Sequence, residues 1–147
     1  MKTLFLMTTA LTLVVGMAFA QQGQVAENFF DQWDMNSDGT VTLDETLEKR
    51  AEIFDMFDQD DDGTLDAVNW QLVVDHLAME EGGNARGLQI GNGPGKLIHE
   101  AMDLGYNDAN GDGVVTKEEF ETASKTLFPK LDKNGDGVLT SADFGRW

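Results

Sequence analysis

The sequence predicts an all-α fold of helix–loop–helix units, and three observations support this prediction. Four segments of twelve residues share one spacing of acidic residues and glycine. The stretches on either side of them carry apolar residues at helical intervals. The first and third segments begin 74 residues apart, and so do the second and fourth, which indicates a duplicated two-loop unit.

The composition narrows the classes of function. The chain has 147 residues, enough for one domain of ordinary size, and its formal net charge is −17. A chain with this much negative charge repels nucleic acid and anionic membranes, so the expected partners are metal ions and a protein target. It has no cysteine, which excludes disulfides, thiolate zinc sites and thiol nucleophiles. The two histidines, His76 and His99, lie in no catalytic motif, so we expect no enzyme.

The first twenty residues have the features of a secretory signal peptide. One basic residue, Lys2, precedes an apolar stretch, and small residues stand at Ala18 and Ala20. A retained membrane anchor is the alternative, but the apolar run is short for one. We therefore expect cleavage after Ala20 and a periplasmic or secreted protein that has no further contact with the membrane.

Each of the four acidic segments begins with the pattern D-x-[DN]-x-[DN]-G, the most specific signal in the chain. The segments are Asp34–Glu45, Asp58–Asn69, Asp108–Glu119 and Asp132–Asp143. They hold 4, 5, 4 and 3 acidic residues, so sixteen of the 27 acidic residues of the chain lie within them. The negative charge is therefore concentrated where cations would bind.

These segments resemble the calcium loops of the EF-hand superfamily. In that family, oxygen atoms at loop positions 1, 3, 5, 7, 9 and 12 surround the ion, and glycine at position 6 allows a sharp turn. The candidate ligands that the resemblance implies are Asp34, Asn36, Asp38, Thr40, Thr42 and Glu45; Asp58, Asp60, Asp62, Thr64, Asp66 and Asn69; Asp108, Asn110, Asp112, Val114, Thr116 and Glu119; and Asp132, Asn134, Asp136, Val138, Thr140 and Asp143. The implied ion is Ca²⁺, with Mg²⁺ or a lanthanide as the alternative at the weaker sites. The implied role is that of a calcium sensor, a buffer or a calcium-stabilised adaptor.

The loops differ at position 12, which supplies two carboxylate oxygens in the strongest sites. Glu45 and Glu119 fit this role in the first and third loops. Asn69 places an amide there in the second loop, and Asp143 in the fourth is one methylene shorter than Glu. We therefore expect the second and fourth loops to bind more weakly, with Asp66 at position 9 as a partial replacement in the second.

A narrower resemblance is to lanmodulin-like proteins, periplasmic lanthanide binders that also carry four closely spaced loops behind a signal peptide. The loops of each unit here start 24 residues apart, and Asp66 matches the Asp that this family has at position 9. The family has Pro at position 2, where this chain has Met35, Gln59, Ala109 and Lys133. Lanthanide binding is accordingly the alternative to calcium binding.

Only twelve residues separate the two loops of a unit, which leaves room for one shared helix rather than two. These helices are expected over 46–57 and 120–131, with Arg50 and Asp55 off the apolar face of the first. Pro129 should kink or interrupt the last turn of the second. The apolar faces consist of Leu47, Ile53, Phe54 and Phe57 in the first helix and Phe120, Ala123, Leu127, Phe128 and Leu131 in the second.

The shared helices also predict how the loops pair. A helix of about 15 residues is about 22 Å long, so the loops at its two ends cannot touch. If the two shared helices pack antiparallel, the first loop pairs with the fourth and the second with the third. Pairing between two chains is the alternative. The pairing residues should be the apolar ones at position 8, namely Val41, Leu65, Val115 and Leu139.

The domain organisation follows from the repeat. After the leader 1–20, one EF-hand domain is expected over 21–147. It consists of unit one over 25–80, a glycine-rich linker over 81–96 and unit two over 97–147.

Overall fold

The computed structural model of the chain describes residues 26–83 and 93–145, and for residues 80–83 it describes the backbone alone. The expected leader 1–20 and the middle of the expected linker lie outside these ranges. The first described element is a helix over residues 26–33. It is followed by β1 Val41–Thr42, α2 Leu43–Phe57, β2 Thr64–Leu65, α3 Ala67–Gly83, α4 Pro94–Glu100, α5 Leu104–Asn107, β3 Val115–Thr116, α6 Lys117–Leu131 and β4 Val138–Leu139.

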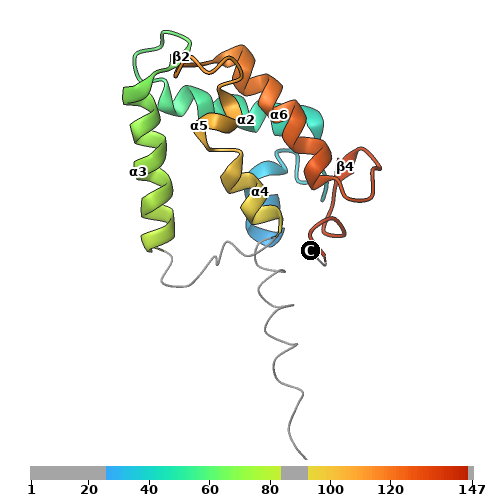
Figure 1. Ribbon diagram of the computed structural model, residues 1–147. Coiled ribbons are helices and arrows are strands. Elements are labelled where there is room, and N and C mark those ends of the chain that lie inside the picture. The colour runs from blue at the N-terminus through green and yellow to red at the C-terminus, as the bar shows by residue number, and fades with distance from the viewer. Residues whose placement is uncertain (1–25, 84–92, 146–147) are drawn as a thin grey trace, which may run out of the picture.

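The fold is mostly helical, as the sequence predicts, and its centre is the pair α2 and α6. Each is a single helix of 15 residues that joins the two loops of its unit. They lie across each other, and α3 stands beside the pair (Figure 1). The expected interruption at Pro129 is wrong, because α6 continues through it to Leu131. The residue that follows, Asp132, still donates its N–H to the Phe128 carbonyl at 3.0 Å.

The loops pair across the two units, which confirms the prediction from helix length. β1 of the first loop pairs antiparallel with β4 of the fourth, and Val41 faces Leu139. β2 of the second loop pairs antiparallel with β3 of the third, and Leu65 faces Val115. All four side chains are at most 1% exposed, so position 8 points into the core at both ends of the molecule.

Two apolar clusters lie at the two ends of the α2–α6 pair. One lies under the first and fourth loops, where Phe29 stacks on Trp33 at 5.0 Å and packs against Phe144 at 4.8 Å. The other lies under the second and third loops, where Phe54 meets Phe120 edge-on at 5.5 Å. Each pair of loops therefore rests on its own part of the core. Among the described residues, no helix is long and apolar enough to cross a membrane.

The structure corrects two further expectations. Helix α3 runs to Gly83 and α4 begins at Pro94, so both ends of the expected linker 81–96 are helical. Pro94 is suited to the start of a helix, because a first-turn residue needs no N–H donor. Arg50, expected off the buried face of α2, is only 2% exposed. Its guanidinium donates hydrogen bonds to Ser124, Ala101 and Asn107 of the second unit.

Candidate metal sites

All four loops are closed by the same hydrogen bonds from the backbone to the side chains at positions 1 and 5. The glycine N–H at position 6 donates to the position-1 carboxylate at 2.8 Å in the first loop and at 2.9 Å in the other three. The position-7 N–H donates to the position-5 carboxylate at 2.9–3.1 Å. These bonds fix the carboxylates at positions 1 and 5 of every loop against the backbone of that loop. That arrangement suits a hard cation.

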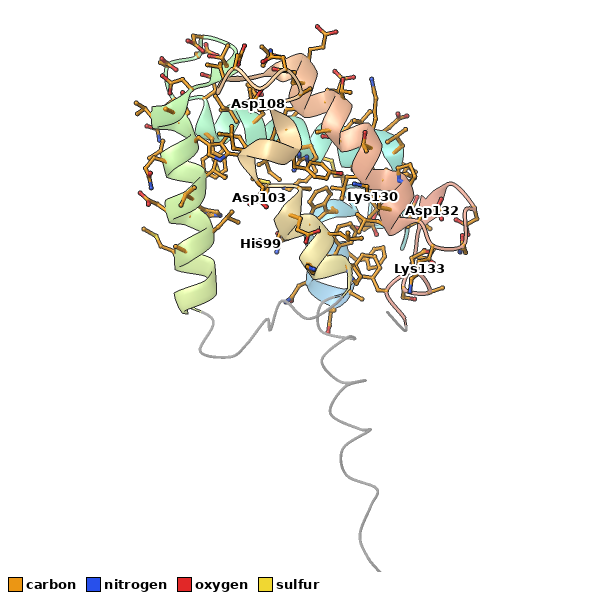
Figure 2. The ribbon with its side chains drawn as sticks, viewed as in Figure 1. His99, Asp103, Asp108, Lys130, Asp132 and Lys133 are labelled. Atoms are coloured by element: carbon orange, nitrogen blue, oxygen red, sulfur yellow. The ribbon has the colours of Figure 1, made fainter. Side chains whose placement is uncertain are left out.

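Each loop also begins in the same way, at the end of a helix. The N–H at position 1 donates to a carbonyl of the last turn, at distances of 2.8–3.0 Å, in Asp34, Asp58, Asp108 and Asp132. A carboxylate at the C-terminal end of a helix is electrostatically unfavourable, because the helix dipole is negative there. A cation bound beside it would remove this cost. Asp108 occupies such a place at the end of α5, and Asp132 at the end of α6 (Figure 2).

The backbone of each loop is left-handed at two positions, of which the sequence motif predicts only position 6. Position 6 has φ values of 80° to 87° and is glycine in every loop. Position 4 is also left-handed, with Ser37 at 60° and Asp61 at 57°, and glycine at Gly111 and Gly135. The Asn-Gly pairs of the third and fourth loops were the available signal for it.

Position 12 of the first loop has a feature that suits a metal ligand. Glu45 Oε2 accepts hydrogen bonds from the N–H and the hydroxyl of Thr42, both at 2.9 Å, in a capping box that starts α2. Its other oxygen, Oε1, is buried and has no hydrogen-bond partner. It is the one such side-chain atom in the described part of the chain. A buried carboxylate oxygen without a partner is costly, and a metal ion at the predicted site would supply the partner.

The third loop has the same capping box with a different second oxygen. Glu119 Oε2 accepts from the N–H and hydroxyl of Thr116, and Oε1 accepts from the Asn110 N–H at 3.3 Å. The carboxylate therefore spans the loop from position 12 to position 3. These bonds, those from Thr116 first, lower the pKa of the Glu119 carboxyl. The predicted position-9 residues Thr42 and Thr116 thus use their hydroxyls to begin the next helix.

The fourth loop places its shorter Asp143 fully inside, at 1% exposure. Oδ1 accepts from the N–H groups of Lys133 and Asn134 at 3.1 and 3.3 Å, and Oδ2 accepts from the Thr140 N–H at 2.8 Å. Both oxygens of Asp143 therefore reach across the loop despite the shorter side chain. Residues 141–144 form a turn rather than a regular helix.

The second loop is built differently at the positions that the sequence marked as unusual. Asn69 is buried, and its amide donates to the Phe57 carbonyl at 3.0 Å. Asp66, expected as a partial replacement for the missing carboxylate, accepts from the N–H groups of Val68 and Asn69 through Oδ1, at 2.7 and 3.0 Å. It therefore caps α3 with one of its two carboxylate oxygens. The amide at position 12 of this loop therefore ties the start of α3 to the end of α2.

The second loop does hold three carboxylates close together. One ligand atom from each of Asp58, Asp60 and Asp62 lies within 4.8 Å of the other two. Partial desolvation and, next, repulsion from Asp62 raise the pKa of the Asp60 carboxyl. The other loops have Asn at position 3, so this is the loop in which all three of positions 1, 3 and 5 carry charge. Like charges at this separation favour a bound cation.

Comparison with known families agrees with the loop geometry. A family model described as EF hand matches residues 26–48, 108–123 and 125–146. These ranges contain the first, third and fourth loops, and the second loop lies outside them. No curated protein matches the chain.

Proposed function

Because the chain belongs to the EF-hand superfamily, we propose that it binds calcium ions at its four loops and that these ions stabilise its folded state. EF-hand loops as a class bind calcium, and bound metal contributes directly to folding free energy. The observation that carries the proposal is Oε1 of Glu45, at position 12 of the first loop, which is buried and has no hydrogen-bond partner.

The donor chemistry of the loops supports calcium in preference to a transition metal. The candidate ligands are carboxylate, amide and backbone oxygens, without thiolate or imidazole. Hard oxygen ligands suit Ca²⁺ and Mg²⁺, and a flexible loop with a bidentate carboxylate suits the larger ion. The first and third loops, which have Glu at position 12, should therefore fill first. The second should fill last, since its position 12 holds an amide, Asn69, whose nitrogen already donates to the Phe57 carbonyl.

The concentration of charge supports a stabilising role. Sixteen of the 27 acidic residues lie in the loops, and in the metal-free protein these carboxylates repel one another. Because α2 and α6 each carry a loop at both ends, ions at all four loops would brace the same helix pair. We propose that calcium acts here as a structural ion of an exported protein. A sensor or a buffer would be the alternative role.

The test is a titration of the metal-free protein with calcium, magnesium and terbium, followed by calorimetry and by thermal unfolding. We expect calcium to bind and to raise the melting temperature strongly. Tighter binding of terbium alone, with little effect of calcium up to about 1 mM, would favour the lanthanide alternative. A calcium-dependent increase in the binding of a hydrophobic dye would favour a sensor over a structural role.

A further inference from the structure

Arg50 is a buried cation held by neutral groups. Its Nη2 donates to Asn107 Oδ1 at 2.8 Å, its Nη1 to the Ala101 carbonyl at 3.1 Å and its Nε to Ser124 Oγ at 3.0 Å. Its guanidinium carbon lies 3.9 Å from the centre of the Phe120 ring. No carboxylate among the described residues forms an ion pair with it. Burial lowers its pKa to about 10, so it keeps its charge at neutral pH.

Arg50 stands where the duplicated halves meet. Its partner Ser124 is 74 residues further along the chain, which makes it the equivalent residue of the second unit. The two helices therefore cross at a pair of equivalent positions, one filled by a long cation and the other by a small hydroxyl. The symmetry of the repeat is broken here, because Arg50 of unit one reaches only into unit two.

The contacts of Arg50 end at a break in the helix that leads into the third loop. The equivalent segment of unit one is the unbroken helix over 26–33, whereas here α4 ends at Glu100 and α5 begins at Leu104. The break frees the Ala101 carbonyl from regular helical bonding, and Arg50 and Asn107 both donate to it, at 3.1 and 2.9 Å.

Asn107 connects this break to the metal loop. It is fully buried, and its amide also donates to the Asp103 carbonyl at 2.9 Å. The next residue is Asp108, the first predicted ligand of the third loop, whose N–H donates to the Leu104 carbonyl at 2.8 Å. With Oδ1 of Asn107 bound to Arg50, both ends of the Asn107 amide group are fixed. The starting direction of the third loop therefore depends on a residue of the other unit.

We propose that Arg50 is a positioning residue for the third loop, and that through Asn107 and the Ala101 carbonyl it sets the calcium affinity of that loop from the opposite unit. The proposal deepens the calcium-binding function and rests on it. Loss of Arg50 leaves the side-chain Oδ1 of Asn107 buried without its donor. The turn that carries Asp108 should therefore loosen. Partners of this kind, which hold a ligand without touching the ion, typically change metal affinity about 10- to 100-fold.

The four position-6 glycines provide one probe for each loop. Each amide donates to the position-1 carboxylate of its own loop, so its NMR signal reports on that loop alone: Gly39, Gly63, Gly113 and Gly137. We would titrate the full chain and its Arg50→Met variant with calcium and follow these four signals. The matched control is Ser124→Ala, which removes a hydrogen bond of Arg50 but leaves its contact with Asn107 in place.

The expected result is selective. In Arg50→Met the midpoint for Gly113 rises by about tenfold, that for Gly63 rises less through the β2–β3 pair, and those for Gly39 and Gly137 stay unchanged. Ser124→Ala leaves all four midpoints as they are, and Asn107→Ala reproduces the Arg50→Met pattern. Equal shifts at all four glycines, or none, would overturn the proposal. If Arg50→Met does not fold, the same four midpoints are compared between Asn107→Ala and Ser124→Ala. A rise for Gly113 in Asn107→Ala alone is then the expected result, and equal midpoints in the two variants would overturn the proposal.

A second readout needs no calcium and separates this proposal from the function on which it rests. In the metal-free protein, Arg50→Met should speed hydrogen exchange of the Asp108 N–H and leave that of the Asp34 N–H, its equivalent in the first loop, unchanged. Equal acceleration at both would mean a general loss of stability and would refute positioning. If calcium moves none of the four glycine signals in the unchanged protein, the proposed function fails, while the exchange result still judges Arg50.

Discussion

Replacing Glu45 by Gln should separate metal binding from folding more sharply than any other substitution in the loops. The exchange keeps the size of the side chain and removes its charge. In the metal-free protein, Oε2 accepts two hydrogen bonds from Thr42, which an amide oxygen can also accept, and Oε1 has no partner to lose. The free energy of unfolding without calcium should therefore change by less than about 1 kcal/mol, because one unpaired buried group replaces another.

The same substitution should weaken the calcium-bound state much more. A contact to a charged group contributes about 1.5–3 kcal/mol, which corresponds to a roughly 10- to 100-fold rise in the dissociation constant of the first loop. Above saturation, each tenfold rise lowers the stabilisation by calcium by about 1.4 kcal/mol. Urea unfolding with and without calcium measures both quantities in one experiment.

Glu48→Gln is the matched control, because Glu48 is exposed on the same helix and outside the loop. It should leave both free energies within about 0.5 kcal/mol of the original. The contrary result would be a loss of stability of the metal-free protein in Glu45→Gln together with an unchanged effect of calcium. That result would make Glu45 a helix cap without a role at a metal site.

The other substitutions should respond according to the hydrogen bonds of each loop. Asp143→Asn should destabilise even the metal-free protein, by about 1–3 kcal/mol in urea unfolding, because its two oxygens accept from the backbone of positions 2, 3 and 9; an unchanged midpoint would contradict this. Asn69→Glu should lower the free energy of unfolding without calcium by about 1 kcal/mol, because the hydrogen bond to the Phe57 carbonyl is lost. It should also tighten calcium binding to the second loop, as measured from the Gly63 amide signal. No gain in affinity would show that position 12 does not limit this loop. Gly137→Ala should lower the free energy of unfolding by about 1–3 kcal/mol, because Gly137 has a φ of 87° that alanine rarely adopts. The control Gly105→Ala lies in a helix with open space around it and should be neutral or stabilising in thermal unfolding.

The loop pairing was predictable because it depends on length and on local pattern. A twelve-residue gap allows one helix, a helix of that length separates its ends, and the inward residue at position 8 then has to find a partner in the other unit. Val41 with Leu139 and Leu65 with Val115 follow from these steps. The position-6 glycines follow from the motif in the same way.

Arg50 was not predictable, because charge normally marks an exposed position and its partners are distant in sequence. Ser124, Ala101 and Asn107 reach it only after the helices cross and the entering helix breaks. The roles of Asp66 and Asn69 were missed for a related reason. Either side chain can bind an ion or the backbone. Which it does depends on the N–H groups at the start of α3 for Asp66 and on the Phe57 carbonyl for Asn69.

A calorimetric titration of the metal-free protein with calcium shows whether the four loops bind this ion. We expect saturable binding of more than two ions per chain, with the first sites filled below about 1 mM. A protein that takes up no calcium by about 10 mM would contradict this expectation.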